Sequence, residues 1–591
     1  MMEELILRIP FAFNYGVCAC LIISATGLSA HAQQRPDAGT SLQQPPGGAL
    51  QAPPSGTDAQ VVMPRAKRAL SVTDQKAWAD KVLVNDVRIS GNTVFDSQTL
   101  TSLLGDIKGK QVELGKLVDA IDAIRKYYVD AGYLLTDVYL PVQDLPQSGA
   151  VLQIEVVEAR IGKVNVNVGT DSGVTQAMAQ NLVASGLQSG TAVRQYEIER
   201  VVYLLKDLPG VDASAVLAAG ANVGEADVTI EVVPTGGKRV NASVLVDNMG
   251  ARSTGDLRAT AIVDVNHPFG IGDQLSIRGQ LTDQSGNGLF RIGYTVPVSG
   301  PTKLNLSLAN TKYSLGAPFN LLGAEGRAQI VSGTVIHPII RSRLNNLVGI
   351  AGLDYKTLRD DTLSIGQSVR TKVETVRLGV LGSTISVGSP EAVLAGQGGS
   401  TIYSVMGTVG HATLNPATII DPEKTRGTFA KLNFDVQRVQ FLSSTISVLG
   451  NISGQFTSRN LRGVERVSYG GPTGVRGYGV PSGTADEGML ATVELRYKLP
   501  ISVWDSPVTV STFYDVATIR ARKSPLAGAT TPNTATFDSI GFGLRLGTEY
   551  KAMASLQIAQ RIGGPYPIGP DGPSLESERR PQGWFSFQYW F

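Results

Sequence analysis

The sequence predicts a membrane β-barrel of about sixteen antiparallel strands, preceded by two small α+β domains. The 353 residues after Lys238 form short segments separated by polar turns, and along each segment apolar and polar residues alternate. At about 22 residues per strand and loop, this length allows roughly sixteen strands. Residues 81–158 and 159–236 share one order of elements, which indicates an internal repeat. The chain also ends in alternating aromatic residues, as barrel strands that face lipid do.

The composition is that of a barrel-rich chain. Charged residues make up 17% of the 591 positions, below the ~25% of soluble domains, and 66 residues are glycine. Glycine is poorly tolerated in helices but suits many tight turns. The formal net charge is only +2, so the chain lacks the basic excess that nucleic-acid binding usually requires. We expect no nucleic-acid partner.

The N-terminal region has the pattern of a secretory signal peptide over residues 1–32. Residues 10–29 are mostly apolar or small, and Ala30 and Ala32 fit the A-x-A cleavage pattern. A membrane anchor is the alternative. Both cysteines, Cys18 and Cys20, fall in this segment, so the mature chain is expected to have no disulfide and no thiolate site. Residues 33–80, rich in proline and glycine, are predicted to be a flexible linker with room for a short helix over 66–80.

Each repeat unit reads as strand, helix, helix, strand, strand. In the first unit, Leu117, Ile121, Ile124 and Tyr128 recur at helical spacing. Neither unit is long enough to bury a large core alone, so we expect each to stack on a neighbour.

Alternation along the predicted strands separates two faces. In residues 493–499, Val493 and Leu495 lie on one face, and Glu494 and Arg496 lie on the other. A membrane barrel with a wet lumen and a soluble sandwich both produce this alternation. The C-terminal strand favours the barrel, because a soluble protein seldom exposes an aromatic stripe. The stripe consists of Phe585, Phe587, Tyr589 and Phe591.

A glycine-rich stretch contains the motif Val475-Arg476-Gly477-Tyr478. Glycines permit a tight loop that folds back into a barrel, and Arg476 would then need an anion. Asp515 is the favoured partner because alternation places it on the inner face. Glu494, Glu549 and a solvated Arg476 remain alternatives.

Several motifs in order resemble a known superfamily. The segments 91–95, 127–133 and 152–158 resemble POTRA domains. The segments Asp247–Ile277, Tyr313–Phe319 and His337–Leu347 are similar to barrel strands of the TpsB transporters of two-partner secretion (ShlB/FhaC/HecB-like). Tyr469–Tyr478, with Asp486-Glu487-Gly488, resembles the lumen-loop motif of this superfamily. The strand motif from Phe513 to Ala517, which includes Asp515, resembles its F-x-D-x-G motif, with Ala517 in place of glycine.

The resemblance implies an outer-membrane transporter whose periplasmic POTRA domains capture a large secreted exoprotein, which then leaves through the barrel. It implies contact between the loop tip and the wall through Arg476 and Asp515, and Phe591 as a C-terminal insertion signal read by the barrel-assembly machinery. Outer-membrane lipid would surround the barrel. An apolar groove beside the second POTRA helix is a candidate cargo surface, although residues in this pattern more often simply form the domain core. They are Ile198, Val201, Val202 and Leu205.

Other function classes are less well supported. A barrel-assembly insertase of the same superfamily is the main alternative, but insertases usually carry more than two POTRA repeats. A passive porin leaves both repeats unexplained. No nucleophile elbow, phosphate loop or zinc motif occurs, and the four histidines are scattered. We therefore expect no enzymatic activity, no metal and no cofactor.

Overall fold

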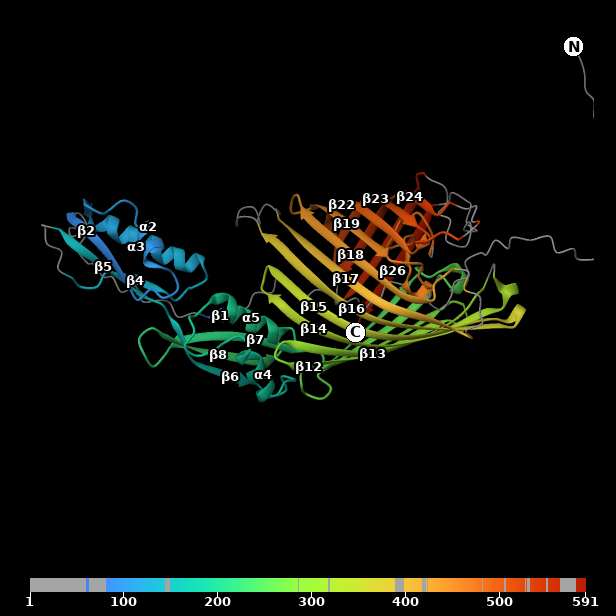
Figure 1. Ribbon diagram of the computed structural model, residues 1–591, viewed down its shortest axis with the longest axis horizontal. Helices are drawn as coiled ribbons and strands as arrows, with labels where there is room; N and C mark the ends of the chain where they lie inside the picture. Colours follow the sequence, from blue (N-terminus) through green and yellow to red (C-terminus); the bar gives the residue numbers. More distant parts are fainter. Residues whose placement is uncertain are drawn as a thin grey trace, which may run out of the picture.

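The computed structural model describes residues 60–62, 81–143, 149–284, 286–316, 319–387, 398–416, 421, 423–480, 482–503, 506–526, 528, 532–548, 551–563 and 581–591. Two small α+β modules lie one after the other and lead into a large barrel (Figure 1). The predicted signal peptide and the expected helix over 66–80 lie outside the described residues. Among the residues described, no helix is both long and apolar enough to cross a bilayer.

The first module packs two helices on a four-stranded sheet. Its longer helix buries the residues that the helical spacing predicted, with Ile124 and Tyr128 fully enclosed. The sheet order is β3-β2-β5-β4. Strand β3 was not anticipated, because KQVE has no clear apolar alternation. The elements are β2 (Lys81–Ser90), α2 (Ser97–Ser102), β3 (Lys110–Glu113), α3 (Leu114–Asp130), β4 (Asp137–Tyr139) and β5 (Ala150–Val157).

The second module follows the predicted order of strand, helix, helix, strand, strand, and it gains one more strand. Residues Gln60–Val62, expected to be flexible linker, form strand β1 and pair in parallel with β7. The prediction of a flexible linker was therefore wrong for these three residues. They form a strand because the free edge of β7 offers backbone N–H and C=O groups with which a neighbouring segment can form hydrogen bonds. The other elements are β6 (Arg160–Val168), α4 (Gln176–Ala184), α5 (Gln195–Lys206), β7 (Val211–Ala219) and β8 (Glu225–Pro234).

The rest of the chain forms a closed antiparallel barrel of sixteen strands. Each strand pairs with its sequence neighbours, and β26 closes the barrel on β9. The strands are β9 (Val240–Asp247), β10 (Arg258–Asn266), β11 (Gln274–Thr282), β12 (Gly288–Ser299), β13 (Thr302–Ser314), β14 (Ala324–Arg341), β15 (Asn345–Thr362), β16 (Gln367–Val387), β17 (Gly398–Asn415), β18 (Gly427–Phe441), β19 (Ile446–Thr457), β22 (Glu487–Val503), β23 (Ser506–Arg520), β24 (Thr534–Thr548), β25 (Ala552–Arg561) and β26 (Gln582–Trp590).

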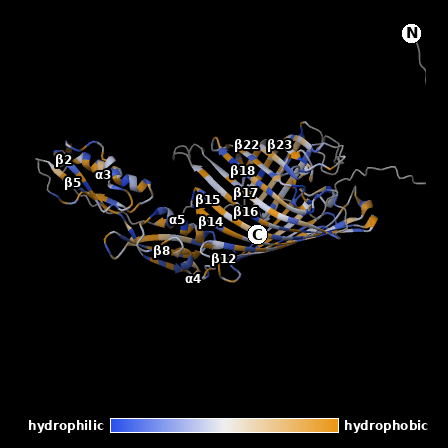
Figure 2. Cartoon of the chain, in the orientation of Figure 1, coloured by the Kyte–Doolittle hydropathy of each residue, from blue (hydrophilic) through white to orange (hydrophobic). Residues whose placement is uncertain are grey.

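The barrel presents apolar side chains outward and polar side chains inward. Apolar and polar residues alternate along the strands (Figure 2). Val493 and Leu495 are exposed on the outer face, whereas Glu494 between them is buried in the lumen. The C-terminal aromatic stripe is also on the outer face, and Phe591 follows β26 with its N–H bonded to the Ala242 carbonyl. An apolar belt around a polar lumen is the arrangement of a membrane barrel.

Candidate functional site in the barrel lumen

The connection between β19 and β22, residues 458–486, folds into the barrel; we call it the lumen loop. It contains a short 3-10 turn, η5 (Gly463–Glu465), and a small hairpin of β20 (Val467–Ser468) and β21 (Thr484–Ala485). Glycine is required at its turns. A Cβ on Gly474 would lie 2.2 Å from the Tyr469 carbonyl oxygen, and Gly471 has φ +95°. The sequence thus allows the loop to double back on itself inside the lumen.

At the tip of the loop, Arg476 forms a two-pronged ion pair with Asp515 of β23. Its Nε donates to Asp515 Oδ2 at 2.9 Å, and its Nη2 donates to Oδ1 at 2.8 Å. The Arg476 backbone N–H donates to the same carboxylate. Asp515 is fully buried. This parallel geometry fixes the direction of the guanidinium as well as its position.

A second acid completes the contact. Arg476 Nη1 donates to Glu494 Oε2 at 2.8 Å, and Arg496 Nε donates to Glu494 Oε1 at 2.8 Å. The guanidinium also lies 3.2 Å from the centroid of the Phe513 ring, a cation–π contact. The sequence left Asp515 and Glu494 as alternative partners, and the structure uses both. The third alternative, Glu549, lies outside the described residues.

The other residues of the motif press the loop tip against the wall. Val475 and Tyr478 are buried, and the Tyr478 ring packs edge-on against Phe537 at 4.9 Å between centroids. A Cβ on Gly477 would lie 2.7 Å from the Ser539 Cβ, so only glycine permits this approach. Trp584 of β26 donates its indole N–H to the Arg476 carbonyl at 2.8 Å. The tip therefore contacts several adjacent strands near the closure of the barrel.

The stem of the loop is held on a different part of the wall. Glu465 accepts from Lys356 Nζ of β15 at 2.6 Å and from Lys431 Nζ of β18 at 2.9 Å. Lys431 also donates to the Glu465 carbonyl at 3.0 Å, as does Gln455 at 3.1 Å. Glu465 is 2% exposed. Sequence reasoning missed this cluster, although alternation would have placed both lysines on the inner face.

A third cluster ties the loop to neighbouring loops. Arg466 bonds Asp486 at 2.9 Å and Glu423 at 2.9 Å, and Arg522 also reaches Glu423. Asp486 is completely buried and accepts the backbone N–H groups of Leu461 and Lys523. The Asp486 of the family-like motif thus closes the base of the loop.

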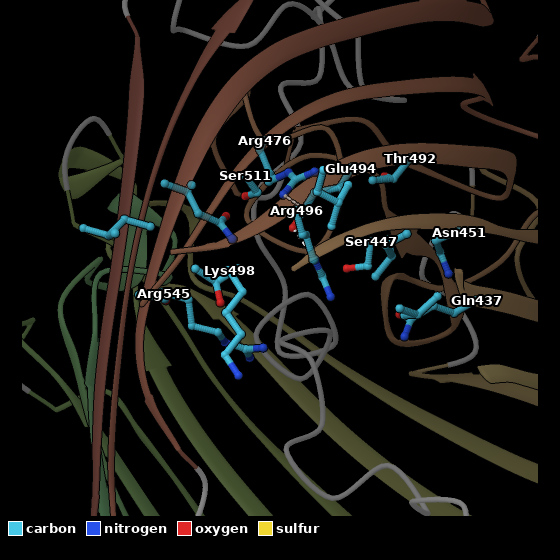
Figure 3. Close-up of a pocket in the computed structure, with 18 of the residues that line it drawn as sticks. Gln437, Ser447, Asn451, Arg476, Thr492, Glu494, Arg496, Lys498, Ser511 and Arg545 are labelled. Carbon is cyan, nitrogen blue, oxygen red and sulfur yellow. Dashed lines mark hydrogen bonds and ion pairs between the residues drawn. The ribbon is translucent and has the colours of Figure 1, made fainter. Parts of the chain in front are cut away.

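A cavity of about 690 Å³ lies between the loop tip and one end of the barrel. Its lining includes the tip residues Pro472, Thr473, Gly474 and Arg476 and the β18–β19 turn, residues 443–445. Figure 3 shows Arg476, Glu494 and Arg496 together at one side of it, with Lys498 and Arg545 extending into the space. The tip of the lumen loop therefore forms a wall of this cavity.

The second module is fixed to the same end of the barrel. Arg341 of β14 forms a two-pronged pair with Asp207, the residue after α5, with both N–O distances at 2.8 Å. Lys303 of β13 donates to the Asp207 carbonyl at 2.7 Å, and the Arg341 guanidinium lies over the Tyr203 ring. Arg341 belongs to the family-like segment His337–Leu347, so the structure gives that segment a role in this joint.

The candidate cargo residues on α5 lie inside the second module. Ile198, Val201, Val202 and Leu205 are each at most 1% exposed and belong to its core. These four residues therefore form the domain core, which was the alternative to a cargo groove in the sequence analysis. A groove on this module would have to be lined by other side chains.

Comparison with known proteins identifies the family. The family described as "Haemolysin secretion/activation protein ShlB/FhaC/HecB" matches residues 224–531, which is just over half of the chain. The chain belongs to this family. The ShlB-type POTRA domain also matches residues 82–159.

Several known proteins are similar to this chain over most of its length. The heme/hemopexin transporter protein HuxB of Haemophilus influenzae is 25% identical over 78% of this chain and 80% of its own. The outer membrane transporter CdiB of Dickeya dadantii is 22% identical over 72% of this chain and 73% of its own. CdiB from Escherichia coli has a similar fold, with a TM-score of 0.67 at 19% identity, covering 87% of this chain and 91% of that chain.

The fold and the family together establish the general function. The protein is an outer-membrane transporter of two-partner secretion. Its POTRA domains lie in the periplasm and recognise a partner exoprotein, which is secreted through the barrel. The periplasmic end of the barrel is thus the end that carries the Asp207–Arg341 joint.

Proposed function

We propose that the lumen loop closes the export path and that the Arg476–Asp515–Glu494 cluster holds it in the closed position. The observation that carries this proposal is the two-pronged Arg476–Asp515 pair between the loop tip and the wall. Cargo that leaves through the barrel must pass this tip. Because the cluster joins one loop to two strands, its rearrangement changes the free cross-section of the lumen.

The proposed cargo is a large exoprotein captured unfolded by the POTRA domains. We expect an adhesin, cytolysin, toxin or haem-binding protein. The relatives are named for heme/hemopexin transport and as CdiB transporters, and these names set the range of cargo to test first. Export needs no nucleotide in this proposal, because folding of the cargo outside the cell biases its diffusion outward. We also expect no enzymatic step, metal or cofactor.

The protein's own assembly is part of the proposal. The exposed outer face, including Phe585 and Phe587, is apolar and suits contact with outer-membrane lipid. We expect the barrel-assembly machinery to read the C-terminal strand that ends at Phe591. Removal of Phe591 should lower the amount of folded barrel in the outer membrane without changing synthesis.

The experiment that tests the proposal is export of the large secreted protein expected to be encoded by the gene beside that of this chain, which we call the exoprotein. Cells with the wild-type chain should release the exoprotein into the medium, and cells without the chain should not. Arg476→Ala should insert normally but reduce export at least about tenfold, because losing a buried ion pair costs about 3–5 kcal/mol and leaves the loop tip in the lumen without a defined position in the path of the cargo. Arg438→Ala is the matched control, because Arg438 lies on the outer face of β18 and is exposed.

Two outcomes would overturn parts of this proposal. Normal export by a stably inserted Arg476→Ala protein would remove the role of the cluster. Unchanged exoprotein release without the chain, together with failed assembly of other barrels, would favour the insertase alternative.

A further inference from the structure

Two cations lie on one row of side chains across the inner wall of the barrel. Lys498 of β22 is registered with Thr509 of β23, and Thr509 is registered with Arg545 of β24. Adjacent strands are about 4.8 Å apart, so the two cationic residues stand about 10 Å apart across a single threonine. Both side chains line the cavity below the loop tip (Figure 3).

These two cations have no acidic partner within the described part of the chain. Arg496, in the next inward row, instead bonds Glu494 at 2.8 Å. The cavity lining contains two acids, Asp435 and Glu494. Glu494 is occupied by two arginines, and Asp435 accepts a hydrogen bond from Asn451 at 3.0 Å. Lys498 and Arg545 therefore carry positive charge that the wall does not neutralise.

The position of the pair fits an approach from the periplasm. The β18–β19 turn lines the cavity, and turns alternate between the two ends of an antiparallel barrel. This turn is therefore at the end that holds the Asp207–Arg341 joint. The row with Lys498 and Arg545 lies between this end and the Arg476 tip, so a chain from the periplasm meets it before the tip.

The surroundings of the pair leave room for an extended chain. Thr509 lies between the two cations, and Ser511 and Gly543 occupy the next row of the same strands. These small residues line a recess, whereas the long cationic side chains reach out from it. A carboxylate above Thr509 could accept hydrogen bonds from both sides, which is the stronger, charge-assisted kind.

We propose that Lys498 and Arg545 form a docking site for acidic side chains of the unfolded cargo on the periplasmic side of the lumen loop. The inference rests on the proposed export function and adds a chemical preference to it. A carboxylate-bearing polypeptide is favoured over a lipid headgroup, because the site lies inside the lumen rather than on the lipid-facing wall.

Binding of a defined peptide tests the site directly. The probe is a rhodamine-labelled oligoglutamate peptide added to the full-length protein in neutral detergent, with oligoglutamine as the uncharged control. We expect oligoglutamate to bind, more weakly as salt is raised, and oligoglutamine not to bind. The Lys498→Gln, Arg545→Gln double variant should bind oligoglutamate roughly tenfold more weakly, whereas Arg438→Gln should bind as the wild type does. Equal binding by the wild type and the double variant would overturn the inference.

Export separates failure of this inference from failure of the export function. The double variant should insert normally and export the exoprotein more slowly. The conservative single variant Lys498→Arg keeps both positive charges, so it should export the exoprotein at the wild-type rate. If the wild type exports the exoprotein but the double variant exports it equally fast, the docking site is wrong and the transporter function stands. If the wild type itself exports nothing, the proposed function fails whatever the peptide result.

Discussion

The two ends of the lumen loop are held by ion clusters of opposite composition. At the tip, one cation, Arg476, lies between two acids, Asp515 and Glu494. At the stem, one acid, Glu465, lies between two lysines. The tip uses a planar guanidinium with paired bonds, whereas the stem uses two ammonium groups that act as point charges.

The difference indicates that the two anchors have different tolerance for movement. Asp515 is fully buried and fixed by two parallel bonds, so a small displacement of the tip breaks both. The stem lysines each keep 13% of their side chains exposed and have flexible stems that can follow a moving carboxylate. We therefore expect the tip to act as a sharp two-position contact and the stem as an adjustable one.

Removal of the tip cation should have the largest effect. Arg476→Ala leaves Asp515 and Glu494 buried with less compensation, at a cost of roughly 3–5 kcal/mol. A spin label attached through Thr473→Cys, an exposed tip position, should become more mobile in the Arg476→Ala background. An unchanged label mobility would show that packing of Tyr478 alone holds the tip.

Neutralisation of the stem acid should have a smaller effect. Glu465→Gln leaves two lysines facing each other, but both can turn toward water in the lumen, so we expect a loss of about 2 kcal/mol. Unfolding of the barrel in urea measures this loss. A loss that equals that of Arg476→Ala would contradict the difference between the two anchors.

Removal of single stem lysines should sharpen the comparison. Lys431→Met and Lys356→Met each leave one lysine on Glu465, so each should cost only about 1 kcal/mol. Lys431→Met should cost more, because Lys431 also donates to the Glu465 carbonyl. The same urea experiment ranks the two variants, and the reverse order would show that the carbonyl contact contributes little.

A buried acid outside the barrel offers a contrast without a cation pair. Burial alone would raise the pKa of Glu158 in the first POTRA domain, but hydrogen bonds from Thr93, the Val94 N–H and Tyr128 hold it below its usual value. Because the folded pKa is the lower one, this stabilisation is present above the unfolded value of about 4.3 and is lost as pH falls below it.

We expect the smallest effect here. The first domain should lose stability only in acid. Thermal unfolding of the whole protein, monitored by hydrogen exchange of the backbone amides of residues 81–158, would measure this loss. Glu158→Gln should flatten this dependence on pH. A wild-type domain that keeps its full stability well below pH 4 would contradict the assignment.

The sequence predicted those features that depend on local periodicity. The barrel, its strand number and the inward position of Glu494 and Asp515 follow from alternation and length. The Arg476 contact followed from the glycine-rich loop and a family-like motif. The periodicity of Ile198 and Val201 could not separate a groove from a core, because both arrangements present the same apolar stripe.

Contacts made by irregular segments were not predictable in the same way. Glu465 reaches Lys356 and Lys431 only because the lumen loop crosses the barrel, and no local pattern encodes that path. Strand β1 forms because the edge of β7 is unpaired, which is a property of the folded domain rather than of residues 60–62. The joint of Asp207 with Arg341 likewise depends on how two domains meet.

The lumen loop crosses the barrel and is attached to the inner wall both at its stem and at its tip. Its stem rests on the wall of β15 and β18, and its tip rests on β22 and β23. A loop that loses one attachment can pivot about those that remain, so the attachment that breaks first determines which side of the lumen opens. Release at Arg476 would free the side next to the barrel closure, whereas release at Glu465 would leave the stem tied to the β17–β18 connection through Arg466 and Glu423.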